Sequence, residues 1–321
     1  MRLASGHREE ASRATDGMAE HFGTMNLWGG DSERTSSLAR AMARLARMPA
    51  IAAWCWGIAG LVMIMALDGT VRTAGLRLVP IYVPLLCATC WALGGRGALA
   101  FALVAAIIAL LPDVMVAPNP LGPASLGNAL IRGAAYLFLA LIIAGYRRAY
   151  DEADYRAMYD GLTGALNRLP FEAAVVRHLA AAQRARETLL VAAIDIDAFK
   201  QINQDYGHAM GDAALRAFSE EALRAVRGSD LFGRLGEDKF GFLLGASSTQ
   251  TAEALAHLLH QRVTSTFAKS GLPLSCSMGA LIVGPGSTLT HVELFERAAG
   301  LVRQAKEAGK GQVLTEAAPG S

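Results

Sequence analysis

Acidic residues that could hold a metal gather after one short apolar segment in the C-terminal half of the chain. The segment TLLVAAIDI, residues 188–196, is typical of a buried strand and places Asp195 near its end. A hairpin turn at residues 235–238 adds the carboxylate of Asp238. The polar residues that follow the first segment are Asp197, Lys200, Asn203 and Asp212.

The chemistry that these residue types favour is the binding of nucleotide phosphates. Carboxylate oxygens suit Mg²⁺, which usually retains waters and bridges to substrate phosphates. The lysines that could balance the phosphate charge are Lys200, Lys306 and Lys310. The alternative is structural, because acidic residues at strand ends are also common as helix caps.

The elements that must position these residues form an α/β pattern from residue 151 onward. Strands are predicted at residues 188–196, on both sides of the 235–238 turn, at 273–283 and close to the C-terminal end. Helical spacing is found over residues 171–186, 211–226, 252–268 and 289–308. Strands that alternate with helices, together with one hairpin, predict a helix-covered sheet.

The preceding part of the chain is dominated by long uncharged segments. We predict four transmembrane helices, at residues 48–67, 78–95, 97–111 and 125–146. The alternative is a very apolar buried helical core. Arginines flank the segment ends that the positive-inside rule places in the cytoplasm, namely Arg40, Arg44, Arg47, Arg96, Arg147 and Arg148.

Two polar segments flank this membrane domain. Residues 1–47 are expected to be a flexible cytoplasmic tail, whose basic end LARAMARLARM could lie along anionic headgroups or be a solvated helix start. Residues 147–159 are expected to form a helix that links the membrane domain to the α/β domain. The formal net charge of only +2 argues against a protein that binds nucleic-acid polymers by phosphate neutralisation.

Five segments of the C-terminal half resemble the GGDEF family, the diguanylate cyclases. They are DGLTGALNR (160–168), IDIDAFKQINQDYGHAMGD (194–212), RGSDLFGRLGEDKF (227–240), SCSMGA (275–280) and AKEAGKG (305–311). The resemblance implies an α+β domain over residues 160–315, similar to class III nucleotide cyclases, with 316–321 as a tail. It also implies the joining of two GTP into cyclic di-GMP with release of two pyrophosphates, in a homodimer at the bacterial inner membrane.

The resemblance also implies a role for each matching residue. Asp195, the backbone carbonyl of Ile196 and Asp238 match the positions that bind two Mg²⁺ ions, and both carboxylates are expected to be catalytic. Asn203 and Asp212 match the positions that read guanine, and Lys200, Lys306 and Lys310 match phosphate contacts. Arg227 and Asp230 match the site that binds the product, cyclic di-GMP.

The signature turn of this family is altered in two places. It reads Gly236-Glu237-Asp238-Lys239-Phe240, with Glu237 where the second glycine is expected and Lys239 where an acid is expected. Glu237 would crowd and repel a nucleotide, and the Lys239 ammonium could pair with Asp238 or Glu237 and compete with Mg²⁺. The fold should tolerate both, because Gly followed by Glu is compatible with a two-residue type II′ turn.

These changes make three functions possible. The first is a domain with weak or lost cyclase activity that still binds cyclic di-GMP. The second is a fully active diguanylate cyclase. The third is a membrane sensor or scaffold that regulates an active partner, and for which nucleotide binding at Arg227 and Asp230 would be unnecessary.

Overall fold

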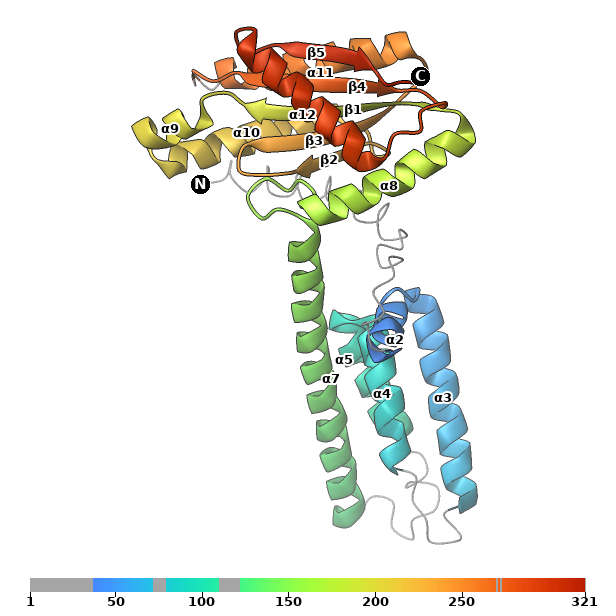
Figure 1. Ribbon diagram of the computed structural model, residues 1–321. Coiled ribbons are helices and arrows are strands. Elements are labelled where there is room, and N and C mark those ends of the chain that lie inside the picture. The colour runs from blue at the N-terminus through green and yellow to red at the C-terminus, as the bar shows by residue number, and fades with distance from the viewer. Residues whose placement is uncertain (1–36, 72–78, 110–121, 270, 272, 321) are drawn as a thin grey trace. The chain divides into compact units, whose positions relative to one another are not determined.

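The computed structural model describes residues 37–71, 79–109, 122–269, 271 and 273–320. The chain divides into a helical unit, Gly30–Asp154, and an α/β unit that begins at Tyr155 and runs to the C-terminal end (Figure 1).

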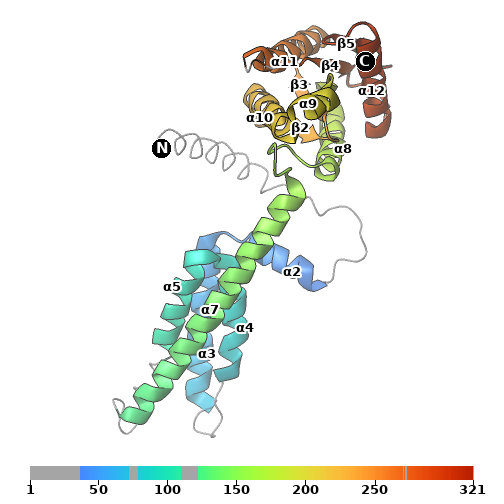
Figure 2. The same ribbon diagram turned by 90° about the vertical axis from the view of Figure 1, so that its left-hand side faces the viewer.

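The helical unit contains four apolar helices that run alongside one another (Figure 2). They are α3 (Ala50–Val71), α4 (Val79–Leu93), α5 (Gly95–Ile108) and α7 (Pro123–Met158). Leu61, Leu86, Phe101 and Ala140 are fully buried between them. Gly94 has a φ of 60°, which a glycine adopts readily, and it forms the tight turn between α4 and α5.

Two of these helices are long and apolar enough to cross a membrane, at Ala50–Asp68 and Leu126–Met158. Within the most apolar stretch of each helix, only 22% and 17% of the residues are buried in the structure, whereas the residues of a core helix in a soluble protein would be mostly buried. The apolar helices Pro80–Leu93 and Gly95–Ile108 are shorter, and about 14 residues reach only about 21 Å of a core about 30 Å thick. Within the described residues, two of the four predicted spans therefore meet the length criterion. Residues 72–78 and 110–121, which include parts of the predicted spans 78–95 and 97–111, lie outside the described part of the chain.

The prediction of a flexible tail up to residue 47 is wrong for its last part. Residues 37–46 form helix α2 (Ser37–Ala46), while residues 1–36 lie outside the described part of the chain. The indole Nε1 of Trp91 donates a hydrogen bond to the carbonyl of Met42 at 2.9 Å, and Arg147 Nη2 donates to the carbonyl of Ala46 at 3.2 Å. These bonds fix α2 within the helical unit because they satisfy carbonyls near its C-terminal end.

Helix α7 continues through residues 147–158, where a linker helix was expected. Arg147 stabilises the start of this linker part of α7. The Nε of Arg147 donates to the Asp151 carboxylate at 2.8 Å, and its Nη1 donates to the carbonyl of Trp91 at 3.0 Å. The guanidinium also lies 5.2 Å from the centre of the Trp91 ring.

The α/β unit is built on a five-stranded sheet in the order β2-β3-β1-β4-β5. All neighbouring strands are antiparallel except β4 and β5, which are parallel. The strands are β1 (Thr188–Ile196), β2 (Leu231–Arg234), β3 (Lys239–Ala246), β4 (Cys276–Val283) and β5 (Val313–Ala317). The helices are α8 (Arg168–Ala185), α9 (Phe199–Tyr206), α10 (His208–Ala225), α11 (Thr249–Lys269) and α12 (His291–Glu307).

Helices cover both faces of the sheet, with α10 and α11 on one face and α8 and α12 on the other (Figures 1 and 2). Successive residues of β1 point to opposite faces, so Leu190 packs in the cluster of α10 and α11 while Val191 packs in that of α8. Gly279 in β4 allows α12 to approach closely, because a Cβ there would lie 2.1 Å from the carbonyl oxygen of Ala298. The predicted helix-covered sheet is confirmed.

The C-terminal end of this unit extends beyond the predicted boundary at residue 315. Strand β5 runs to Ala317, and the amide of Ala318 donates to the carbonyl of Ile282 at 2.8 Å. Ala318 is also buried. The prediction of a tail over 316–321 is therefore wrong for residues 316–318, because they pair with and pack against β4.

Candidate nucleotide and metal site

The central strand β1 brings the two predicted catalytic carboxylates together. In the ladder between β1 and β3, Asp195 lies directly opposite Lys239, the first residue of β3. One step further, the amide of Ile196 donates to the carbonyl of Asp238 at 3.1 Å. Asp195, Ile196 and Asp238 thus lie together at the same end of neighbouring strands, as the sequence predicts.

The Asp195 carboxylate has an ammonium group beside each oxygen. Lys306 Nζ, from the last turn of α12, donates to Oδ1 at 2.6 Å, and Lys239 Nζ lies 3.8 Å from Oδ2. Burial raises the pKa of the Asp195 carboxyl above its ordinary value and outweighs the hydrogen bond from Lys306, while the charge of Asp238 raises it further. The two lysines therefore offset the unfavourable ionisation of a buried acid.

Lys239 lies within ion-pair distance of both expected metal ligands. Its Nζ is 3.7 Å from Asp238 Oδ1 in addition to its 3.8 Å separation from Asp195 Oδ2. Within the described residues, no group of three or more His, Cys, Asp or Glu is arranged to hold a metal. Two carboxylates and a carbonyl fit one Mg²⁺, which needs few protein ligands beside phosphate and water. They do not fit a second one, because Lys239 places a positive charge where the family pattern has an acid.

Asp197, which the sequence also offered as a metal ligand, is used as a structural anchor. Its carboxylate accepts hydrogen bonds from the hydroxyls of Ser275 and Ser277 at 2.7 and 2.8 Å and from the amide of Gly311 at 3.0 Å. It is almost completely buried. Because Gly311 follows the loop that carries Lys310, Asp197 ties this loop to the start of β4.

The phosphate-contact candidates lie in two places. Lys200 is exposed on α9, and Lys306 and Lys310 lie at and just beyond the C-terminal end of α12. Lys310 adopts a left-handed conformation with a φ of 64°, and its amide donates to the carbonyl of Ala305 at 3.1 Å. Its exposed side chain extends from a backbone that is held in place on both sides.

The guanine-reading candidates lie where α9 meets α10. Asn203 packs against Gly211 in the first turn of α10, where a Cβ would lie 2.0 Å from Asn203 Oδ1. This Oδ1 atom is buried and has no hydrogen-bond partner among the described residues. Asp212 follows Gly211 and is half-exposed, 3.8 Å from Arg216. An acceptor that is buried and unsatisfied costs about 1–3 kcal/mol, so this position suits a ligand with an N–H donor.

The signature turn differs from the expected type II′ geometry. Residues 235–238 form a longer connection that closes with a hydrogen bond of 2.8 Å from the amide of Leu235 to the carbonyl of Lys239. Neither Gly236 nor Glu237 has a positive φ, which a type II′ turn requires at its first central residue. Glu237 is accommodated because its backbone conformation is open to any residue, and its side chain is exposed.

Arg234 stabilises the signature turn through hydrogen bonds of its guanidinium group. It donates to the carbonyls of Gly236 at 3.1 Å and Glu237 at 2.7 Å, and to the carboxylate of Asp160 at 2.9 Å. Nothing in the local sequence identifies this role, because Asp160 is 74 residues away.

The predicted product site contains two residues with different surroundings. Arg227 is exposed, whereas Asp230 is 7% exposed. The Asp230 carboxylate accepts from the amides of Arg227 at 2.8 Å and Gly245 at 3.2 Å. Asp230 therefore braces the turn from which Arg227 extends.

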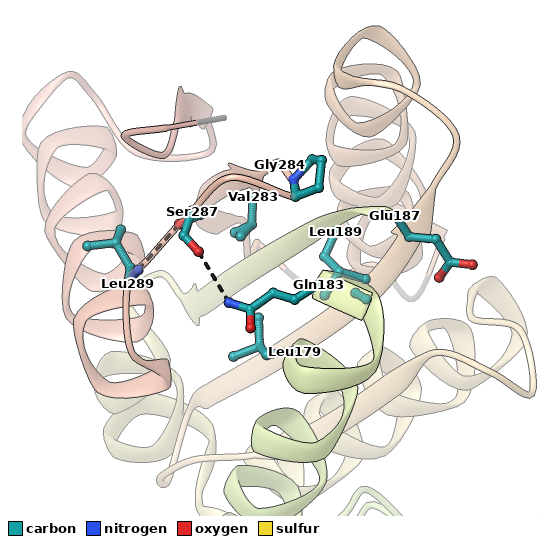
Figure 3. A pocket seen from close by; sticks show the side chains of 10 residues that line it. Leu179, Gln183, Glu187, Leu189, Val283, Gly284, Ser287 and Leu289 are labelled. Carbon is teal, nitrogen blue, oxygen red and sulfur yellow. Dashed lines mark hydrogen bonds between the residues drawn. The ribbon is translucent and has the colours of Figure 1, made fainter. Parts of the chain in front are cut away.

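A cavity elsewhere in this unit is too small for a nucleotide. It lies between the end of α8 and the segment after β4, has a volume of about 10 Å³ and is crossed by a hydrogen bond from Gln183 to the carbonyl of Ser287 (Figure 3). A cavity of this volume has room for about one water molecule.

Comparisons with known proteins find a family match for the α/β unit. Residues 157–312 match the family model described as diguanylate cyclase, GGDEF domain. The chain is 33% identical over 164 residues to diguanylate cyclase DgcP of Pseudomonas aeruginosa, covering 51% of this chain and 24% of that protein. It is 32% identical over 167 residues to diguanylate cyclase DgcS of Shewanella oneidensis, covering 50% and 53%. The chain thus spans about a quarter and about half of the length of these two relatives.

A solved structure with a similar sequence is that of the GGDEF domain of DgcB from Caulobacter crescentus in complex with cyclic di-GMP. It is 25% identical, covers 50% of this chain and 95% of that chain, and has a TM-score of 0.45.

Proposed function

We propose, from the premise that residues 157–312 are a GGDEF domain of the diguanylate cyclase family, that this chain is a cyclic di-GMP signalling protein of the bacterial inner membrane with a weakened cyclase. Its nominal reaction is the conversion of two GTP into cyclic di-GMP and two pyrophosphates. The domain lies in the cytoplasm, makes the product slowly or not at all, and still binds guanine nucleotide and cyclic di-GMP.

The observation that carries the weakened activity is the position of the Lys239 ammonium. It lies within 3.8 Å of both Asp195 and Asp238, the two carboxylates that would hold Mg²⁺. When bound, Mg²⁺ would polarise the α-phosphate of GTP. A neighbouring positive charge lowers the affinity of such a site for a divalent cation, since like charges about 4 Å apart repel by about 4 kcal/mol at an effective dielectric constant near 20.

The unpartnered oxygen of Asn203 supports guanine binding. Guanine has N–H donors at N1 and N2, for which Asn203 and Asp212 supply acceptors, whereas adenine would leave these acceptors unsatisfied. Lys200, Lys306 and Lys310 hold the phosphates, and Lys310 does so as a point charge without the two-pronged geometry of an arginine. Arg227 binds the guanine edge of cyclic di-GMP.

The helical unit anchors the domain in the lipid bilayer. Its support is the low burial of the two long apolar helices, together with exposed apolar side chains such as Ile51, Leu130 and Phe138. Arg40, Arg44 and Arg47 recur with helical spacing along and just after α2, and Arg40 and Arg44 are exposed, so α2 lies against anionic lipid headgroups. An even number of membrane passes, whether the four predicted or the two that meet the length criterion, places both α2 and the α/β unit on the cytoplasmic side.

The working form is a homodimer that assembles through the GGDEF domain and the linker part of α7. Each domain holds one nucleotide, so product formation requires the 3′-hydroxyl of one GTP to meet the α-phosphate of the other across two domains. Sedimentation of the detergent-solubilised chain should therefore show a dimer that dissociates on dilution, and a monomer at every concentration would contradict this arrangement.

A fully active cyclase is the second candidate, and it is favoured by the retention of Asp195, Asp238, Lys200, Asn203 and Asp212. The Lys239 side chain is 61% exposed, so it has room to move away from the carboxylates. A scaffold that regulates an active partner is the third candidate, for which loss of nucleotide binding would change nothing.

The test is the formation of cyclic di-GMP from GTP and Mg²⁺ by the purified full-length protein, stripped of bound nucleotide. We expect at least about ten times more product from the double variant Glu237→Gly, Lys239→Glu than from the unchanged protein, because one site charge is reversed and the turn is opened. Asp195→Ala, with its metal ligand removed, is the control for contaminating activity. If the unchanged protein forms as much product as the double variant, and this activity is lost in Asp195→Ala, the result would favour the fully active cyclase.

A further inference from the structure

We infer that Lys239 is a resident cation of the nucleotide site: its ammonium takes the place of one Mg²⁺ ion and binds the triphosphate directly, so that nucleotide binding depends little on Mg²⁺. This inference rests on the proposed guanine-nucleotide site and adds to it, because it assigns a gain of function to a residue so far described only as an obstacle to metal binding.

The charges around Asp195 balance one another. The two carboxylates of Asp195 and Asp238 are matched by the two ammonium groups of Lys239 and Lys306, all within 3.8 Å of a partner. A site with an acid at residue 239 would instead carry three carboxylates and one ammonium, and it would repel a triphosphate until divalent cations were bound. Here that repulsion is offset by the chain itself.

The two lysines contact the carboxylates differently. Lys306 Nζ is 2.6 Å from Asp195, which is a hydrogen bond, and its side chain is 33% exposed. Lys239 Nζ is 3.7 and 3.8 Å from its partners, beyond hydrogen-bond length, and its side chain is 61% exposed. An ammonium group has three N–H donors, and within the described part of the chain those of Lys239 make no hydrogen bond, so they are available to phosphate oxygens.

Hydrogen bonds hold the backbone that carries Lys239 in place. This residue opens β3 opposite Asp195, and its carbonyl accepts hydrogen bonds from the amides of Leu235 and Gly236 at 2.8 and 3.3 Å. Arg234 fixes the carbonyls of Gly236 and Glu237 in the same turn. The side chain that carries the ammonium therefore extends from a fixed backbone position beside the carboxylates.

The experiment measures the affinity of the full-length protein in detergent for a fluorescent, non-hydrolysable GTP analogue, once in Mg²⁺ and once in EDTA. For the unchanged protein we expect the two dissociation constants to agree within about threefold. Lys239→Ala should bind at least about ten times more weakly in EDTA than in Mg²⁺, because its carboxylates are no longer balanced. Lys239→Arg keeps the charge and should behave like the unchanged protein.

Two further measurements separate this inference from its premise. Lys310→Ala should weaken binding by the same factor in both conditions, since its phosphate contact does not involve the carboxylates. Titration with Mn²⁺, followed by its paramagnetic resonance signal in the presence of the analogue, should give one bound ion per chain, and two for Lys239→Glu.

The outcomes are distinguishable. Binding by the unchanged protein that requires Mg²⁺ as strongly as that of Lys239→Ala would overturn the role of Lys239 and leave the nucleotide site intact. Absence of binding in both conditions, by a correctly folded sample, would overturn the nucleotide site and the inference together.

Discussion

Arg234 and Asp160 form an ion pair of 2.9 Å that connects the start of the GGDEF domain to its signature turn. Asp160 stands two residues after the end of α7, and its carboxylate also accepts from the hydroxyl of Thr163 at 2.6 Å. The same guanidinium holds the carbonyls of Gly236 and Glu237. One side chain thus joins the segment that follows the linker helix to the turn that presents Asp238 and Lys239.

Removal of this guanidinium should loosen the signature turn. We expect Arg234→Ala to destabilise the domain by about 1–3 kcal/mol, because two turn carbonyls lose this donor and the half-buried Asp160 carboxylate keeps only its hydrogen bonds from Thr163. Amide hydrogen exchange of residues 235–239 should become faster in the full-length protein. Arg224→Ala is the matched control, since its ion pair with Glu220 is exposed and its loss should leave exchange at these residues unchanged.

The ion pair also predicts a dependence of stability on pH. Burial opposes ionisation of Asp160, but hydrogen bonds from Thr163 and Arg234 outweigh it and hold its pKa below the ordinary 3.8. A carboxyl whose pKa is lower in the folded state contributes stability above pH 3.8 that is lost as the pH falls through the folded value. Asp160→Asn should therefore be less stable than the unchanged protein at pH 7, and the difference should shrink below pH 3.8.

Urea unfolding of the two full-length proteins across this pH range measures the difference directly. A gap that stays constant down to the lowest pH would show that the ionisation of Asp160 contributes nothing to stability.

The strands and the long helices could be predicted because their signals are local. The apolar run of residues 188–196 became β1 with these bounds, and its pairing with β3 brought Asp195 and Asp238 together as expected. Helix α9 was not predicted, because its eight residues FKQINQDY are too short and too polar to display a repeating apolar stripe. A helix start at the end of the predicted tail was one of two open alternatives, but the contacts of α2 with Trp91 and Arg147 could not be predicted because these residues are distant in the sequence.

The proximity of Asp195 and Asp238 could be predicted from the sequence, but the side chains that pair with each acid could not. Asp195 and Asp197 are two residues apart and of the same type, yet one faces two lysines and the other two serines from β4 and the segment before it. Ser275 and Ser277 are about 80 residues distant in the chain, so only the register of β1 and β4 reveals the difference. The same holds for Lys239, whose opposition to Asp195 is a consequence of the β1–β3 register.

Gly211 should be required for guanine selectivity rather than for stability. A Cβ at this position would lie 2.0 Å from Asn203 Oδ1, which is too close, so the Asn203 side chain must shift to make room for it. We expect Gly211→Ala to displace Asn203 and to reduce the preference for GTP over ATP by about tenfold, the equivalent of about 1.4 kcal/mol. Competition of unlabelled GTP and ATP against a labelled analogue measures this ratio.

Gly245→Ala is the matched control, because a Cβ there has open space around it. The role of Asn203 would be refuted by a Gly211→Ala protein that binds the labelled analogue and discriminates between GTP and ATP as well as the unchanged protein.

Arg227 and Asp230 should respond differently to substitution, although they belong to one predicted site. Arg227→Ala removes an exposed side chain, so it should abolish cyclic di-GMP binding and leave thermal stability unchanged. Asp230→Ala removes the acceptor of two backbone amides in a buried position and should cost about 1–3 kcal/mol of stability. Calorimetric titration with cyclic di-GMP and thermal unfolding of both variants separate the two roles. If Arg227→Ala binds cyclic di-GMP with unchanged affinity, the receptor function is excluded at this site, because the Asp230 carboxylate is occupied by the backbone and Arg227 is the member of the pair that can reach a ligand.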